Sequence, residues 1–119
     1  MNERFETEFK ELRDNPEIKQ MVYDWMVEKG LDPKCKGFDY TLDIITLSII
    51  KKKYSRETIA KLTSFVAYKN GIKDWSVQRQ MRWVCTIKTK SKYKVIDICS
   101  GAWYEIRNKI ENKKGNGND

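Results

Sequence analysis

The chain has 119 residues, of which 39% are hydrophobic and 34% are charged, and its formal net charge is +7. This length is enough for one domain with one core. The longest apolar run, around Ile44–Ile50, is far shorter than the roughly 20 residues of a membrane span. The N-terminal segment MNERFETEFK lacks the apolar stretch of a secretory signal. We therefore expect a single cytoplasmic domain over residues 1–110, with no membrane partner.

The residue types that catalysis and metal binding need are scarce. There is no histidine, and the three cysteines, Cys35, Cys85 and Cys99, stand at no spacing typical of a metal or redox site. No pair of carboxylates is spaced for acid–base chemistry, and no glycine-rich loop is present to hold a phosphate. We expect plain thiols, no metal, no cofactor, no small-molecule substrate and no enzyme activity.

The charge is unevenly distributed along the chain. Residues 1–50 carry 7 Lys/Arg and 11 Asp/Glu, whereas residues 51–119 carry 17 Lys/Arg and 6 Asp/Glu. A basic half favours a polyanionic partner such as nucleic acid. The alternative is a lysine-rich surface that is simply solvated.

The hydrophobic periodicity is helical throughout, so we predict an all-α fold of about six helices. An extra N-terminal helix, Glu3–Arg13, lies within residues 1–14. A second helix begins at Asn15-Pro16, a cap followed by an N1 proline, and ends near Gly30. The third, Phe38–Lys53, is apolar on most sides and is therefore predicted to be the central helix.

The second half of the chain continues the helical pattern. Ser55 is expected to cap a fourth helix over Arg56–Lys69. After a turn at residues 70–73, Asp74 is expected to cap a fifth helix, Trp75–Thr89. Residues 90–94 are predicted to form a linker. The last helix covers Val95–Ile110, interrupted or weakened at Gly101, and residues 111–119 form a disordered tail.

The segment from Thr63 to Arg82 predicts a helix-turn-helix. Ala67 is small where two helices would cross, and Gly71 stands four residues later, where a turn needs positive φ. Apolar residues that would hold the two helices together are Val66, Ile72 and Val77. A second helix presented in this way can enter the major groove of DNA.

The fifth helix has an apolar stripe and an opposite polar face. Val77, Met81 and Val84 share the stripe, and the arginines lie outward. The residues predicted to contact bases are Ser76, Gln78, Arg79 and Arg82. Those predicted to contact phosphate are Lys51, Lys52, Lys53, Arg56, Lys73, Lys88, Lys90 and Lys92. The alternative for Arg79 and Arg82 is a solvated helix face, which could also be paired with glutamates from the acidic half.

Tryptophans near this face predict an interface of a different kind. Trp75 and Trp83 point outward in the helical projection, and an exposed indole often anchors a partner protein. Trp83 could instead be covered by the N-terminal helix or by a second subunit. Trp103 supports the same protein-interaction hypothesis.

Two stretches resemble the DNA-binding effector domain of the stage-zero sporulation response regulator of endospore-forming bacteria. In EKGLDPKCKGFDYTL the matching residues are Gly30, Pro33, Lys36, Gly37, Phe38, Tyr40 and Leu42. In the helix-turn-helix they are Leu62, Val66, Ala67, Lys69, Val77, Arg79 and Arg82, with Met81 replacing another aliphatic residue. Ser76 stands where the family usually has arginine, and Trp83 where it has histidine. We expect a standalone variant of this domain, without the family's phosphoacceptor receiver domain.

This resemblance implies a helical domain of roughly six helices that binds DNA through the fifth helix and regulates transcription. The leading hypothesis is a small, standalone, sequence-specific regulator of double-stranded DNA, associated with the nucleoid. The alternative is a protein-interaction module, as a homodimer or as a modulator of a transcription factor, which keeps the fold and has lost DNA binding.

Overall fold

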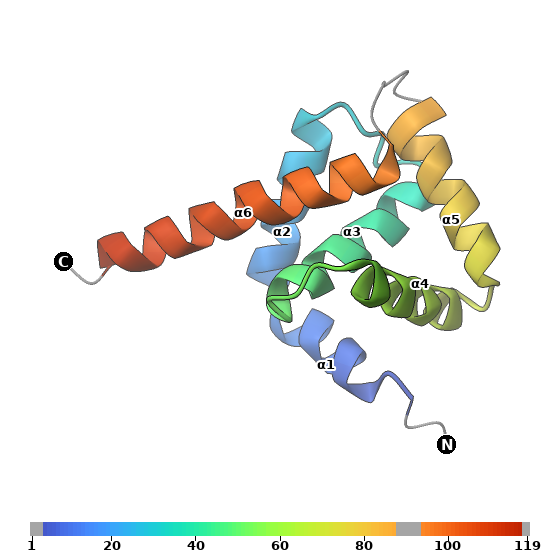
Figure 1. Cartoon of the computed structure of the whole chain (residues 1–119), viewed down its shortest axis with the longest axis horizontal. Coiled ribbons are helices and arrows are strands. Elements are labelled where there is room, and N and C mark those ends of the chain that lie inside the picture. The colour runs from blue at the N-terminus through green and yellow to red at the C-terminus, as the bar shows by residue number, and fades with distance from the viewer. Residues whose placement is uncertain (1–3, 88–93, 118–119) are drawn as a thin grey trace.

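A computed structural model describes residues 4–87 and 94–117, without the side chains of residues 87, 96 and 113–117. All of the regular structure in these ranges is helical, so the all-α prediction is confirmed (Figure 1). The elements are α1 (Glu6–Asp14), α2 (Pro16–Glu28), α3 (Lys36–Ile50), α4 (Arg56–Asn70), α5 (Asp74–Arg82), the π-helix η1 (Trp83–Ile87) and α6 (Val95–Gly117). Within the described ranges, no helix has both the length and the apolar composition needed to cross a bilayer.

Helix α3 is the centre of the molecule, as its sequence predicts. It contacts α1, α2, α4, α5 and α6, which surround it in Figure 1. Between Gly37 and Ile49 every residue except Asp39 is buried, and Ile44, Ile45 and Leu47 are fully buried. Each such side chain stabilises the fold by about 1.5–3 kcal/mol. The other helices are thus positioned by their contacts with the buried helix α3.

The N-terminal segment with helix α1 is attached to this core by contacts between aromatic rings and by one cluster of ion pairs. Phe5, in the left-handed region with φ 67°, packs edge-on against Phe65 of α4 at 5.5 Å. The Lys51 ammonium binds Glu8 at 2.7 Å and Glu11 at 2.8 Å. The positive φ at Phe5 makes residues 4–5 a turn, so α1 begins at Glu6 and not at the predicted Glu3, which lies outside the described residues.

Helix α6 differs from its prediction in two ways. It runs without interruption through Gly101, and it continues past Ile110 to Gly117, into the segment predicted as a tail. The residues after Ile110 include Glu and Lys, which are good helix formers. In Figure 1 its C-terminal part extends beyond the rest of the fold.

Trp103 on α6 belongs to the core and not to an interface, so its use in the protein-interaction hypothesis is wrong. Its side chain is 7% exposed, and its indole N–H donates to the Ser48 carbonyl oxygen at 3.2 Å. The Arg107 guanidinium covers the ring at 4.7 Å. Burial with a satisfied N–H is the usual structural role of tryptophan.

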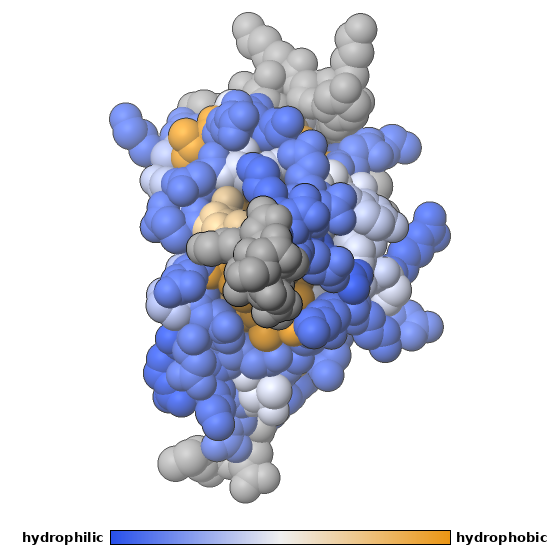
Figure 2. Space-filling view, turned by 90° about the vertical axis from the view of Figure 1, so that its left-hand side faces the viewer, coloured by the Kyte–Doolittle hydropathy of each residue, from blue (hydrophilic) through white to orange (hydrophobic). Residues whose placement is uncertain are grey.

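Seen from the side toward which α6 projects, the surface is mostly hydrophilic, with an apolar area beside the helix (Figure 2). Ile18 and Met21 of α2 and Ile110 of α6 line a hollow there, together with Asp14, Asn15, Pro16 and Glu17.

Candidate nucleic-acid interface

The position of α5 depends on a close approach to α3 at Gly37. A Cβ atom on this residue would lie closer than 3.0 Å to the backbone carbonyl oxygen of Gln80. Only glycine therefore allows the two helices to cross at this separation. In the sequence, Gly37 was one of the residues that resemble the sporulation regulator family, and it had no predicted structural role. A glycine at the start of a strongly apolar helix could have indicated that another helix crosses there closely.

The turn between α4 and α5 has the geometry that its sequence predicts. Gly71 ends α4 with φ 66°, and the Ile72 N–H donates to the Ala67 carbonyl oxygen at 3.0 Å, as in a glycine-terminated helix. Val66 and Val77 are fully buried between the two helices. The segment is a helix-turn-helix in the geometric sense.

The predicted cap at Asp74 is wrong. Lys73 occupies the cap position, without a side-chain hydrogen bond, and Asp74 is the first residue of α5. Its carboxylate instead accepts a hydrogen bond from the Ser64 hydroxyl at 2.5 Å. This bond joins α4 to α5.

The fifth helix also ends earlier than predicted. It changes to a π-helix at Trp83, and the predicted end at Thr89 lies outside the described residues. The π-turn contains Val84 and Thr86, β-branched residues that fit an α-helix less well. Val84 and Cys85 are both fully buried there.

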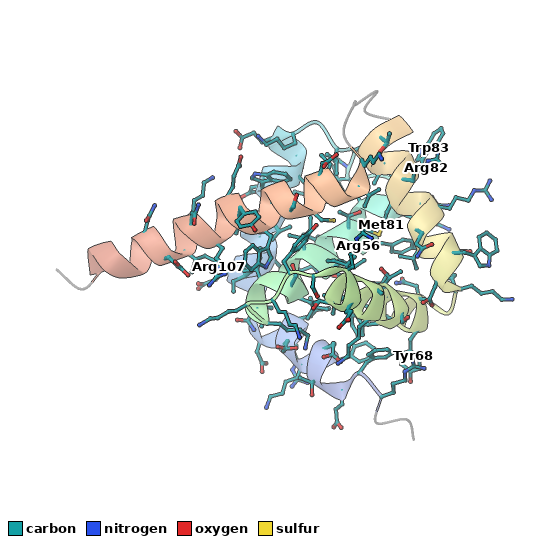
Figure 3. All side chains as sticks on the ribbon, in the orientation of Figure 1. Arg56, Tyr68, Met81, Arg82, Trp83 and Arg107 are labelled. Atoms are coloured by element: carbon teal, nitrogen blue, oxygen red, sulfur yellow. The ribbon has the colours of Figure 1, made fainter. Side chains whose placement is uncertain are left out.

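Two arginines occupy the outward face of α5, opposite a buried stripe. Val77 and Met81 are at most 3% exposed, whereas Arg79 and Arg82 are exposed. Figure 3 shows Arg82 pointing away from the core, beside Trp83. Among the described residues neither guanidinium is paired with a carboxylate, so pairing with glutamates from the acidic half is wrong, whereas the exposure of both arginines also fits the alternative of a solvated face.

The remaining predicted base contacts differ in accessibility. Gln78 is exposed beside the arginines, whereas Ser76 is half-buried at the edge of the outward face. Trp75 and Trp83 are 59% and 45% exposed, so the expected cover of Trp83 by the N-terminal helix is absent. That helix packs against α3, α2 and α4 instead.

The predicted phosphate contacts separate into three groups. The Lys51 ammonium is neutralised by Glu8 and Glu11; burial lowers its pKa, but the hydrogen bonds and charges of both carboxylates outweigh this and raise it. It is therefore not available to DNA. Exposed members of the set are Lys52, Lys53, Arg56 and Lys73. Outside the described residues lie Lys88, Lys90 and Lys92.

Arg56, one of the predicted phosphate contacts, lines a hollow together with residues of the fifth helix. A hollow of about 400 Å³ is lined by Arg56, Ile59, Ala60 and Thr63 of α4, Gln78 and Met81 of α5, and Val95 of α6. Arg56 and Gln78 thus line one hollow between α4 and α5, beside the buried Met81. Lys52 and Lys53 lie at the end of α3 opposite to the crossing with α5.

The cysteines belong to the core. Cys85 and Cys99 are buried, whereas Cys35 is half-buried. Burial raises the pKa of Cys85 to about 11, although the Thr41 hydroxyl opposes this, and burial also raises the pKa of Cys99. In the part of the chain that the structure describes, no group of three His, Cys, Asp or Glu side chains could hold a metal ion.

In comparisons with known proteins, no family model matches this sequence, and no curated protein or solved structure matches it significantly.

Proposed function

We propose that this chain is a sequence-specific regulator that binds double-stranded DNA with the outward face of α5 in the major groove. The observation that carries the proposal is the pair of exposed arginines, Arg79 and Arg82, on the second helix of a helix-turn-helix. Both guanidiniums are free of carboxylate partners within the described residues. A guanidinium can bind guanine O6 and N7 in bidentate fashion.

The positive charges around this face support contacts with the DNA phosphates on either side of the groove. Lys73 precedes α5, and Arg56 approaches Gln78 from α4. The basic half of the chain carries an excess of eleven positive charges. Such a surface attracts a polyanion and positions it, while base edges provide the sequence preference.

The first test is a salt titration of binding to a fluorescent duplex, measured by anisotropy. If about six phosphates are neutralised, log K falls with log salt with a slope near −5. Arg79→Ala should weaken binding about 5- to 150-fold, the effect of losing one bidentate contact. Arg13→Ala, an exposed arginine on α1 whose loss removes the same charge, is the matched control and should change affinity less than twofold. Absence of binding at low salt would refute the proposal.

A second candidate function is a protein interface centred on the exposed indoles. Trp75 and Trp83 are as exposed as expected for tryptophans that anchor a protein interface and whose partner is absent. In that case Trp83→Ala would reduce self-association in sedimentation experiments, and Arg79→Ala would not. A chain that remains monomeric at high concentration would exclude the homodimer.

A further inference from the structure

Two exposed indoles, Trp75 in α5 and Trp83 at the first residue of η1, have no role in the proposed arginine contacts. Trp75 is 59% exposed and Trp83 is 45% exposed, whereas the other two tryptophans, Trp25 and Trp103, are 5% and 7% exposed. An indole has a large apolar surface, and these two, one in the first turn of α5 and one at the first residue of η1, offer apolar surface to a partner.

The spacing of these indoles places them among the arginines. Trp75, Arg79 and Trp83 follow one another at intervals of four residues, which in a helix forms a single slowly turning stripe. Arg82 lies on the same side. The only acidic residue of α5 is Asp74, and its carboxylate is bonded to the Ser64 hydroxyl.

A surface with this composition is complementary to the floor of the DNA major groove. There, thymine presents a methyl group, which is apolar, next to the acceptor atoms of neighbouring purines. Because the stripe carries no free carboxylate, it can approach the DNA phosphates without charge repulsion. The two guanidiniums are donors that match the purine acceptor atoms between the thymine methyl groups. A purely apolar partner would leave both guanidiniums without hydrogen bonds.

We infer that Trp75 and Trp83 contact the C5 methyl groups of two thymines, which makes them specificity residues for a thymine-containing site; this rests on the proposed function. Eight residues of α-helix rise about 12 Å. Base pairs in duplex DNA are stacked about 3.4 Å apart. The two thymines are therefore separated by a few base pairs, with Arg79 and Arg82 reading purines between them.

The same geometry removes Ser76 from the set of base contacts. Two large indoles hold the helix axis away from the groove floor, at a distance that an arginine side chain can span. Ser76 is half-buried at the edge of the face and has a short side chain, so it does not reach a base.

The test replaces thymine by uracil, which removes only the C5 methyl group. Duplexes that bind the wild type are first selected from a random-sequence library, and the selected pool is then synthesised once with thymine and once with uracil. The dissociation constants of the full chain for the two pools are compared. The wild type should bind the uracil pool about fourfold more weakly for each methyl lost. The double variant Trp75→Ala/Trp83→Ala should bind both pools equally. Tyr104→Ala, which removes a 60% exposed ring on α6, is the control and should retain the discrimination.

The outcomes separate this inference from the proposed function. If the wild type binds both pools with equal affinity, or if the double variant still discriminates, the thymine inference is wrong while DNA binding stands. If neither pool is bound, the proposed function itself fails. If the double variant changes only self-association in sedimentation, the indoles form a protein interface, which also overturns the inference. Both substituted residues are exposed, so the variants should fold, and thermal unfolding verifies this.

Discussion

Gly37 lies where α3 and α5 cross, so adding one methyl group there tests whether the close approach of these helices holds α5 in place. In Gly37→Ala the new Cβ atom would lie closer than 3.0 Å to the Gln80 carbonyl oxygen. This oxygen belongs to the backbone and cannot rotate away, so the two helices must separate. Overpacking of this kind costs about 1–3 kcal/mol.

The same substitution also has a favourable effect, which must be subtracted. Alanine is more favourable than glycine inside a helix by about 1 kcal/mol, and by less at Gly37 because it lies in the first turn of α3. The expected net destabilisation is about 1–2 kcal/mol. A shifted α5 should also weaken any binding through its outward face.

Gly101 provides a matched control in the middle of α6. A Cβ atom there would meet only the Trp25 ring, at 3.6 Å and 3.7 Å, which is an ordinary van der Waals contact. Gly101→Ala should therefore stabilise the fold by about 0.5–1 kcal/mol. Urea unfolding followed by circular dichroism measures both variants. Equal or greater stability of Gly37→Ala relative to the wild type would refute the close-crossing argument.

Three other predictions follow from buried groups. Lys51→Met should destabilise the fold by about 1–3 kcal/mol because it leaves the buried Glu8 carboxylate unpaired. Its control is Lys53→Met, which changes an exposed residue and should alter the free energy of unfolding by less than about 0.5 kcal/mol in the same urea assay. In the native state at pH 8 a thiol reagent should modify Cys35 first, with Cys85 protected until unfolding; three equally fast thiols would contradict this. Burial raises the pKa of Cys85 from about 9 in the unfolded chain to about 11 in the fold, so its contribution to the free energy of unfolding is complete below pH 9 and is lost as the pH rises toward 11. A free energy of unfolding that stays constant from pH 8 to pH 11 would be inconsistent with the burial of Cys85.

The fold could be predicted where the signal is local. The apolar run of α3 indicated the central helix, and Gly71 indicated the turn because a positive φ is a property of a single residue. The buried stripe of α5 followed from helical periodicity. These features depend on neighbours within one or two helical turns, which the sequence shows directly.

The errors arose where residues far apart in the chain meet. Gly37 is in contact with Gln80, and Trp103 is bonded to Ser48, 55 residues away. Lys51 pairs with Glu8 43 residues earlier, so a cation predicted to contact phosphate is part of the core. A helical projection shows which side chains share a face, but it does not show what covers that face.

The most direct test of the central claim is a nitrogen–proton NMR spectrum of the four indole N–H groups during titration with duplex DNA. Trp75 of α5 and Trp83, the first residue of η1, are exposed, whereas the indole N–H groups of Trp25 and Trp103 donate to Glu105 and to Ser48 within the fold. If the outward face of α5 contacts DNA, the resonances of Trp75 and Trp83 shift and those of the buried pair do not. Binding of DNA without a shift of either exposed indole would contradict the account.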